Sequence, residues 1–168
     1  MKITLYMAIS IDGFIAKSNG DSDWVSETDA DLFEKSIHNA GCIILGHRTY
    51  KQYLHDLYPI EGVTNIVLAS HPQNSEFKNV FFAQSPQEAI HIANSQGHTE
   101  ALLIGGGRTN AAFLNENLID AIILSVHPLI LQDGIRLFEG NENMVPLEQT
   151  MMKEIGDGLV HLYYNVKK

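Results

Sequence analysis

The stretch Ala101-Leu102-Leu103-Ile104-Gly105-Gly106-Gly107-Arg108-Thr109-Asn110 decides the fold of this chain. Its four apolar residues predict a buried strand, its three glycines predict a tight turn, and residues 108–114 then have helical character. A strand that runs through glycine into a helix presents backbone N–H groups and the positive end of the helix dipole to an anion, usually a phosphate. The alternative is a tight turn without a ligand, because the pattern matches neither GxGxxG nor a Walker loop.

Length and charge limit the classes of protein to consider. The chain has 168 residues, which predicts a single domain over residues 1–168 that buries a substantial core. Its formal net charge is -9, from 20 acidic and 11 basic side chains, and this balance argues against nucleic acid as a partner. A single anionic cofactor remains compatible with that charge, because it needs only local donors.

Cysteine and histidine usage gives no sign of a metal site. Cys42 is the one cysteine and lies in the apolar run 42–45, which predicts a buried, inert thiol. No histidine pair has HxxxH spacing, and His127 is expected to be structural. No apolar run approaches the roughly 20 residues that span a bilayer, and Ser10 and Asp12 interrupt the N-terminal apolar stretch. We expect a cytoplasmic protein without a membrane segment.

The order of predicted elements indicates an α/β protein. Continuous apolar strands alternate with helices, which is typical of a mainly parallel sheet covered on both faces. The last strands follow one another without a helix, which predicts an antiparallel hairpin at one edge, and residues 132–157 are expected to be rich in loops. Predicted strands cover residues 3–9, 14–16, 42–45, 65–69, 80–83, 101–104, 122–126 and 159–166, the seventh within an apolar run over 121–131 that Pro128 breaks. Predicted helices cover 26–40, 49–55, 86–95 and 108–114.

Three predicted strand ends carry small or phosphate-binding residues. They are Gly46-His47-Arg48-Thr49, Ala69-Ser70-His71 and residues 105–109. Ligands of open α/β sheets bind at the carboxyl ends of strands, so three such turns together favour a dinucleotide.

These motifs, in this order and spacing, resemble the dihydrofolate reductase superfold over roughly residues 3–140. The closest branch is the reductase domain of the bifunctional riboflavin-biosynthesis deaminase/reductase and its stand-alone relatives. The resemblance implies a three-layer α/β/α domain. Its motifs are Ala8-x-Ser10-x-Asp12-Gly13-x-Ile15-Ala16, Gly46-x-x-Thr49-Tyr50, Ile104-Gly105-Gly106-Gly107 and Pro128…Gly134…Leu137-Phe138.

The resemblance implies a nicotinamide dinucleotide across the strand ends. It places Gly105, Gly106 and Gly107 against the pyrophosphate and Arg108 and Thr109 beside it at the start of the helix. In this fold two adjacent glycines often share a cis peptide bond. Further expected cofactor contacts are Gly46, Arg48 and Thr49 near phosphate oxygens, Ser70 and His71 near the adenosine ribose, and Ala8 by the nicotinamide amide.

One position departs from the family pattern. The family usually has arginine directly after Gly46, facing the 2′-phosphate of NADPH, and this chain has His47 there. Arg48, one place later, is the expected substitute. We therefore expect NADPH, with NADH as the alternative.

The helix that opens at Ser26 carries the expected chemistry. Asp29 and Phe33 lie at i and i+4, so a carboxylate and a ring share one side of that helix. By resemblance, Trp24, Asp29 and Phe33 have the spacing of the active-site tryptophan, acid and aromatic wall of dihydrofolate reductases. Ser125 aligns with the hydroxyl that supports the acid. A carboxylate with a raised pKa can organise proton delivery during reduction of C=N. The alternative is that Asp29 merely complements the helix dipole.

Other positions bear on the substrate. Dihydrofolate reductases keep an arginine two residues before the Asn-Ile-x-Leu strand for the folate carboxylate, and Val63 stands here, which disfavours folate. Asp12 either caps its turn or contacts substrate. The riboflavin branch acts on a phosphoribosylaminopyrimidine, and Lys17, Arg136 and Lys153 are the unranked candidates for its phosphate.

The sequence therefore predicts an NADPH-dependent reductase, similar to 5-amino-6-(5-phosphoribosylamino)uracil reductase. It would transfer hydride to a C=N or C=O carbon of a small heterocyclic or sugar-like substrate, with Asp29 as the catalytic acid. The alternatives are a true dihydrofolate reductase and a nucleotide-binding sensor without catalysis. We also expect a homodimer, because the apolar run 122–131 and the segment after it would expose apolar surface.

Overall fold

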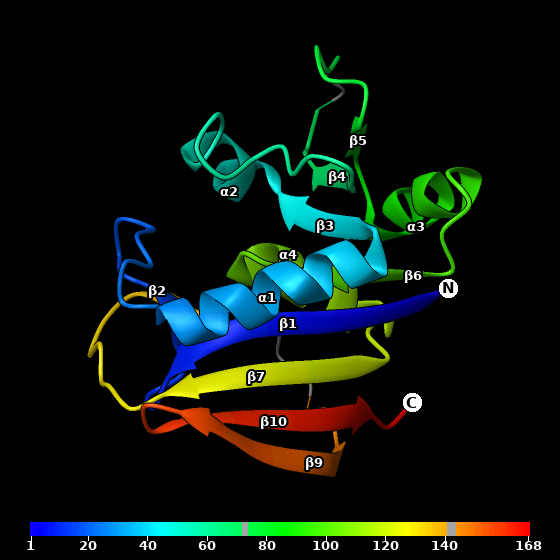
Figure 1. Ribbon diagram of the computed structural model, residues 1–168. Coiled ribbons are helices and arrows are strands. Elements are labelled where there is room, and N and C mark those ends of the chain that lie inside the picture. The colour runs from blue at the N-terminus through cyan, green and yellow to red at the C-terminus, as the bar shows by residue number, and fades with distance from the viewer. Residues whose placement is uncertain (72–73, 141–143) are drawn as a thin grey trace.

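A computed structural model describes residues 1–71, 74–140 and 144–168 of the chain. Its centre is an eight-stranded sheet with the strand order β5-β4-β3-β6-β1-β7-β10-β9 (Figure 1). The strands are β1 (Lys2–Ser10), β2 (Phe14–Ala16), β3 (Cys42–Gly46), β4 (Thr64–Leu68), β5 (Val80–Ala83), β6 (Glu100–Leu103), β7 (Ala121–His127), β8 (Ile135–Arg136), β9 (Leu147–Gly156) and β10 (Leu159–Val166). The helices are α1 (Glu27–Ala40), α2 (His47–Gln52), α3 (Pro86–Ser95) and α4 (Gly107–Asn115).

Helices cover both faces of the sheet, because its central strands are apolar on both sides. Along β3, Cys42 and Ile44 belong to one hydrophobic core and Ile43 and Leu45 to the other. The first core includes residues of α3 and α4, and the second includes residues of α1 and α2. Successive side chains of a strand point to opposite faces, so this alternation places the sheet between two helical layers. The expected three-layer α/β architecture is confirmed.

The pairing of the strands also follows the expectation. Strands β1, β3, β4, β5, β6 and β7 are parallel to their neighbours among themselves. The antiparallel pair β9–β10 closes one edge of the sheet, with β10 antiparallel to β7 as well. The mainly parallel sheet with a C-terminal antiparallel hairpin is therefore confirmed.

The prediction that residues 132–157 are rich in loops missed a long strand. Leu147–Gly156 forms a ten-residue strand, and Ile135–Arg136 pairs with β2. Nine of the ten β9 residues are exposed. A strand that buries neither face carries no hydrophobic alternation, and this is the signal by which strands are recognised.

Capping residues set the ends of the helices largely as predicted. The Ser26 side chain accepts a hydrogen bond from the Asp29 N–H, and Gly41 ends α1 with φ 66°. Ser85 caps α3 in the same way, with Pro86 in its first turn. Helix α2 starts at His47, two residues earlier than predicted, and ends at Gln52.

The parallel strands end on the left of Figure 1, where β2 and α2 also lie. Turns after β3 and β6 meet there, because the Gly46 N–H donates a hydrogen bond of 2.8 Å to the Gly105 carbonyl. The Gly105–Gly106 peptide bond is cis, as the resemblance implied. Within the described residues, no helix is long and apolar enough to cross a membrane.

Candidate active site

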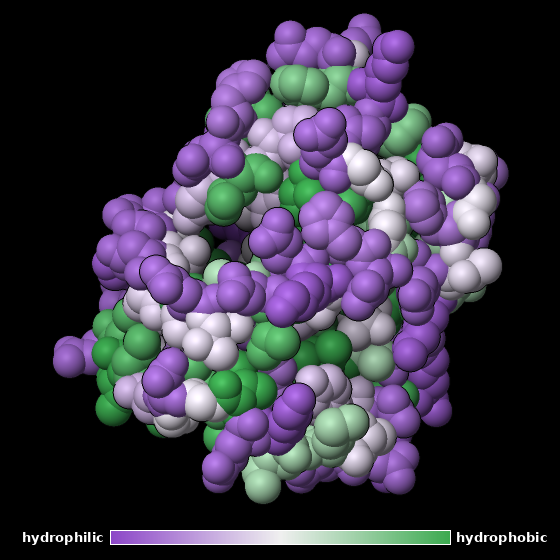
Figure 2. All heavy atoms as spheres, in the orientation of Figure 1, coloured by the Kyte–Doolittle hydropathy of each residue, from purple (hydrophilic) through white to green (hydrophobic). Residues whose placement is uncertain are grey.

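A cleft of about 990 Å³ opens at the carboxyl ends of the parallel strands. Its walls come from α1, from α2 with residues 57–62, and from the ends of β1 and β6. In Figure 2 a hollow lies between the polar side chains of the α1 region and the α2 region above it. This is the edge of the sheet where ligands of open α/β folds bind.

Glycine is required in the two turns that meet behind this cleft. A Cβ at Gly46 would collide with the Thr109 hydroxyl, and a Cβ at Gly107 would collide with the Arg136 carbonyl. Gly106 differs, since the nearest atom to a Cβ there would be the Thr49 hydroxyl at 3.4 Å. Gly106 caps α4 without a side-chain hydrogen bond and lines the cleft. The start of α4 therefore presents bare backbone toward the cavity.

The predicted cofactor residues divide into three groups. Ala8, Arg48, Thr49 and Gly106 line the cleft. Gly46, Gly105, Gly107 and Thr109 are buried in the turns behind it. Ser70, His71 and Arg108 are exposed and do not belong to the described residues that line the cleft, and Arg108 lies 3.9 Å from the Glu139 carboxylate.

Asp29 stands at the inner end of the cleft and is 1% exposed. Its Oδ1 accepts a hydrogen bond of 2.9 Å from the Tyr6 hydroxyl and lies 2.9 Å from His161 Nε2. Burial, and then the charge and hydrogen bond of Asp29, raise the pKa of Tyr6 well above its ordinary range, so Tyr6 remains a donor. Phe33 also lines the cleft and packs edge-on against Tyr6 at 5.1 Å between ring centroids. The expected pairing of a carboxylate and an aromatic wall is thus present.

Sequence reasoning missed the groups that hold Asp29. His161 is 3% exposed, and its Nδ1 lies 3.4 Å from the Tyr163 hydroxyl. The alternating pattern of residues 159–166 put His161 on the inward face of its strand, and a histidine there was the available signal. Its partner Asp29 lies 132 positions away in the chain, which no local pattern reveals.

Three other predicted site residues need correction or a structural reading. Ser125 is buried between Ala8 and His161 in register, but its hydroxyl has no hydrogen-bond partner among the described residues, so it does not support Asp29. Asp12 accepts hydrogen bonds from the Leu131 and Gln132 N–H groups, as a turn cap does. A hydrogen bond with Ser10, and then these backbone donors, lower the pKa of Asp12.

Trp24 lies beside a structural histidine. Its ring packs edge-on against His127 at 5.1 Å, and Trp24 is not among the described residues that line the cleft. The His127 Nε2 accepts a hydrogen bond from the Ser26 N–H, and its Nδ1 lies 3.1 Å from the Ser125 carbonyl oxygen, so backbone groups occupy both ring nitrogens. Across residues 1–71, 74–140 and 144–168 no cluster of ligating side chains could hold a metal ion.

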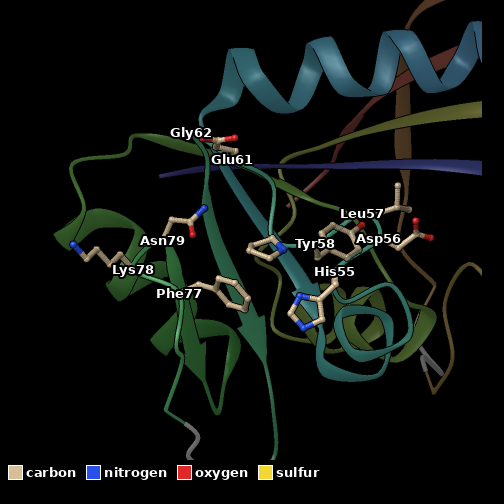
Figure 3. Close-up of a pocket in the computed structure, with 10 residues that line it drawn as sticks. His55, Asp56, Leu57, Tyr58, Glu61, Gly62, Phe77, Lys78 and Asn79 are labelled. Atoms are coloured by element: carbon tan, nitrogen blue, oxygen red, sulfur yellow. The ribbon is translucent and has the colours of Figure 1, made fainter.

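A smaller hollow of about 540 Å³ adjoins the cleft beyond residues 57–62 (Figure 3). The His55 and Phe77 rings lie 5.9 Å apart there, and the Lys78 side chain points away from both in Figure 3. Asp56 and Glu61 line the same hollow, and Lys78 is the one Lys or Arg side chain among its described lining residues. It offers no net positive charge to an anion.

Comparisons with known proteins show what this chain is similar to. The model of the RibD C-terminal domain family matches residues 1–161. The uncharacterised protein YwjB of Bacillus subtilis (strain 168) is 30% identical over 97% of both chains. A candidate riboflavin biosynthesis protein from Shewanella sp. PV-4 has a TM-score of 0.81 at 25% identity and is covered completely, as is this chain.

A more distant structural neighbour is a two-activity protein. The diaminohydroxyphosphoribosylaminopyrimidine deaminase/5-amino-6-(5-phosphoribosylamino)uracil reductase from Thermotoga maritima has a TM-score of 0.76 at 18% identity. The likeness covers 99% of this chain and 56% of that one. At this identity the likeness concerns the fold.

Proposed function

Because the chain belongs to the RibD C-terminal domain family, whose members are reductases, we propose that it is an NADPH-dependent reductase. It would transfer hydride to a C=N or C=O carbon of a small heterocyclic or sugar-like substrate. The observation that carries the proposal is the shared cleft, in which Gly106 at the start of α4 and the carboxylate of Asp29 line one cavity. A phosphate-binding backbone and a proton donor thus lie within reach of one dinucleotide and one substrate.

The residues present fit such a cofactor. A side chain at Gly106 would stand in the cleft, so glycine there keeps space beside the helix start. Gly105, Gly106, Gly107, Arg108 and Thr109 would hold the pyrophosphate with Thr49. Arg48, an exposed cation on the cleft wall, would contact the 2′-phosphate of NADPH. Ala8 would lie beside the nicotinamide amide, and Ser70 and His71 near the adenosine ribose.

The bound cofactor would supply the hydride, and the chain's own residues would manage the proton. Tyr6 and His161 both contact Oδ1 of Asp29, which leaves Oδ2 to face a substrate nitrogen or oxygen. Phe33 packs against Tyr6 at this end of the cleft, where Asp29 is 1% exposed, so little solvent would compete with the substrate for the carboxyl group. Asp29 would pass its proton to the atom next to the carbon that accepts hydride.

The experiment that tests the function is calorimetric titration with NADPH and NADH, followed by turnover assays on the saturated protein. We expect micromolar binding of NADPH, weaker binding of NADH, and oxidation of NADPH in the presence of aminopyrimidine substrates. Absence of binding by either nucleotide would contradict the proposal.

Dihydrofolate reductase is the alternative within the same class. Val63, at the place of the folate-binding arginine, is 2% exposed within a hydrophobic core and offers no cation. Turnover of dihydrofolate by the saturated protein would favour that alternative over ours.

A further inference from the structure

The charges of the cleft point to a substrate class. We infer that the substrate carries no phosphate and is a neutral or cationic nitrogen heterocycle, such as an aminopyrimidine or its riboside. The inference rests on the proposed function, because it assigns Arg48 to the cofactor. It departs from the phosphorylated substrate that the resemblance suggests.

Acidic side chains outnumber Lys and Arg in the cleft. Asp29, Glu34 and Glu61 line it, and Arg48 is the one Lys or Arg side chain among its described lining residues. Its histidine, His38, lies 3.9 Å from Glu34. A phosphate ester carries about -1.5 to -2 charges at neutral pH and is normally met by several cationic donors. The described lining of this cleft has one Lys or Arg cation and three carboxylates to meet that charge.

The cations outside the cleft lining include the three considered for a substrate phosphate. All eleven Lys and Arg residues of the sequence fall within the described ranges, so ten lie outside the cleft lining. Lys17 is paired with Asp23, and the Arg136 guanidinium lies 5.0 Å above the Phe14 ring. Lys153 is exposed on β9. None of the three cations considered for a substrate phosphate therefore lines the site.

The adjoining hollow does not supply the missing charge. His55 and Lys78 line it together with Asp56 and Glu61, and Lys78 points away from the rings that face one another there. A ligand that reached from the cleft into this hollow would pass Glu61, which lines both cavities. The described residues that line the cleft and the hollow therefore carry no net positive charge.

If Arg48 binds the cofactor, it is not free to bind a substrate phosphate as well. We assign it to the cofactor because it lies in the first turn of α2 next to Thr49, whose hydroxyl is the nearest atom to a Cβ at Gly106. A substrate phosphate would then have no Lys or Arg partner among the described lining residues, which include Glu34 and Glu61, and like charges across a binding surface select against the wrong ligand. A ligand that presents only uncharged amino and carbonyl groups is not repelled by these carboxylates.

The test uses aminopyrimidine ribosides and their 5′-phosphates as matched pairs, titrated into the NADPH-saturated protein. We expect each riboside to bind at least about tenfold more tightly than its phosphate, a difference of about 1.4 kcal/mol. Tighter binding of the phosphate in any pair would overturn the inference, and so would the failure of every compound to bind. NADPH binding is measured first, so a failure of the proposed function is recognised separately.

Two variants at exposed positions give a further test that does not depend on changes in the core. Glu61→Lys adds a cation at an exposed position and should narrow or reverse the preference for the riboside. Arg48→Gln should weaken NADPH binding about tenfold and leave NADH binding unchanged, because NADH lacks the 2′-phosphate. If Arg48→Gln instead weakens binding of the 5′-phosphates alone, Arg48 serves the substrate and the inference is wrong.

Discussion

At the scale of single residues, Asp29 separates an enzyme from a nucleotide sensor. Asn in its place keeps the size and can still accept from Tyr6, but it cannot release a proton. We expect Asp29→Asn to bind NADPH normally and to lose about 10²- to 10⁴-fold in turnover, the usual contribution of general acid catalysis. Calorimetry and steady-state rates would measure the two effects. Unchanged turnover would show that Asp29 only complements the dipole of α1.

In the proposed function His161 would act on the substrate only through Asp29, which makes it a positioning residue. The pair is buried, at 2.9 Å between Nε2 and Oδ1, so loss of the donor would leave Asp29 without one of its two contacts. We expect His161→Leu to lower kcat about tenfold or more with little change in KM, and His161→Gln, which can still donate, to lose less. Equal losses in the two variants would contradict this role.

The matched control is the other buried histidine of the chain's carboxyl-terminal half. His127 has both ring nitrogens occupied by backbone groups and is not among the described residues that line the cleft. His127→Gln should lower the free energy of unfolding. In this background, the ratio of kcat between His161→Leu and His161→Gln should stay unchanged.

Cys42 gives a prediction about pH. Burial raises the pKa of its thiol to about 12, whereas an exposed thiol titrates near 8.5. Between these values the unfolded chain has released the thiol proton and the folded chain retains it, so the free energy of unfolding falls as pH rises through this range. Cys42→Ala should make the free energy of unfolding depend less on pH, as measured by urea unfolding from pH 8 to 10. The native thiol should also resist alkylation until the chain unfolds.

At the scale of elements, the turn between β6 and α4 joins the fold to the site. Gly106 and Gly107 are neighbours with different surroundings, since a Cβ on Gly107 meets the Arg136 backbone and one on Gly106 enters the cleft. We expect Gly107→Ala to lower the free energy of unfolding by about 1–3 kcal/mol, as overpacking does. Gly106→Ala should cost less stability and weaken NADPH binding about tenfold. Urea unfolding and calorimetry on both variants check the contrast, and equal effects on binding would contradict it.

Elements with local signals could be predicted, and contacts between distant elements could not. Ser26, Gly41 and Ser85 marked helix ends because capping depends on neighbours a few residues away. Strand β9 was not predicted, because an edge strand with both faces exposed needs no periodic pattern of apolar residues. In the site, the i, i+4 spacing placed Asp29 beside Phe33, while His161 reaches Asp29 only through the order of the strands in the sheet.

At the scale of the whole molecule, exposed apolar side chains lie in the two regions that the sequence suggested. Ile130, in the apolar run 122–131, is 65% exposed, and Met151 and Met152, in the segment after it, are 52% and 64% exposed on β9. Strand β9 is the outer strand of the eight-stranded sheet, at the bottom of Figure 1, and apolar atoms lie over this region in Figure 2. An edge strand offers unpaired N–H and C=O groups to another chain.

We therefore expect a homodimer formed through β9, with the same surface contributed by both copies. Light scattering at micromolar concentration should give twice the 18.7 kDa of one chain. Met151→Lys with Met152→Lys should shift the mass toward a single chain, because lysines along an edge strand oppose pairing. Ile11→Lys is the control, since Ile11 is 62% exposed in the turn after β1. A monomer in the unaltered protein would end the dimer prediction, and dissociation by the control alone would move the interface away from β9.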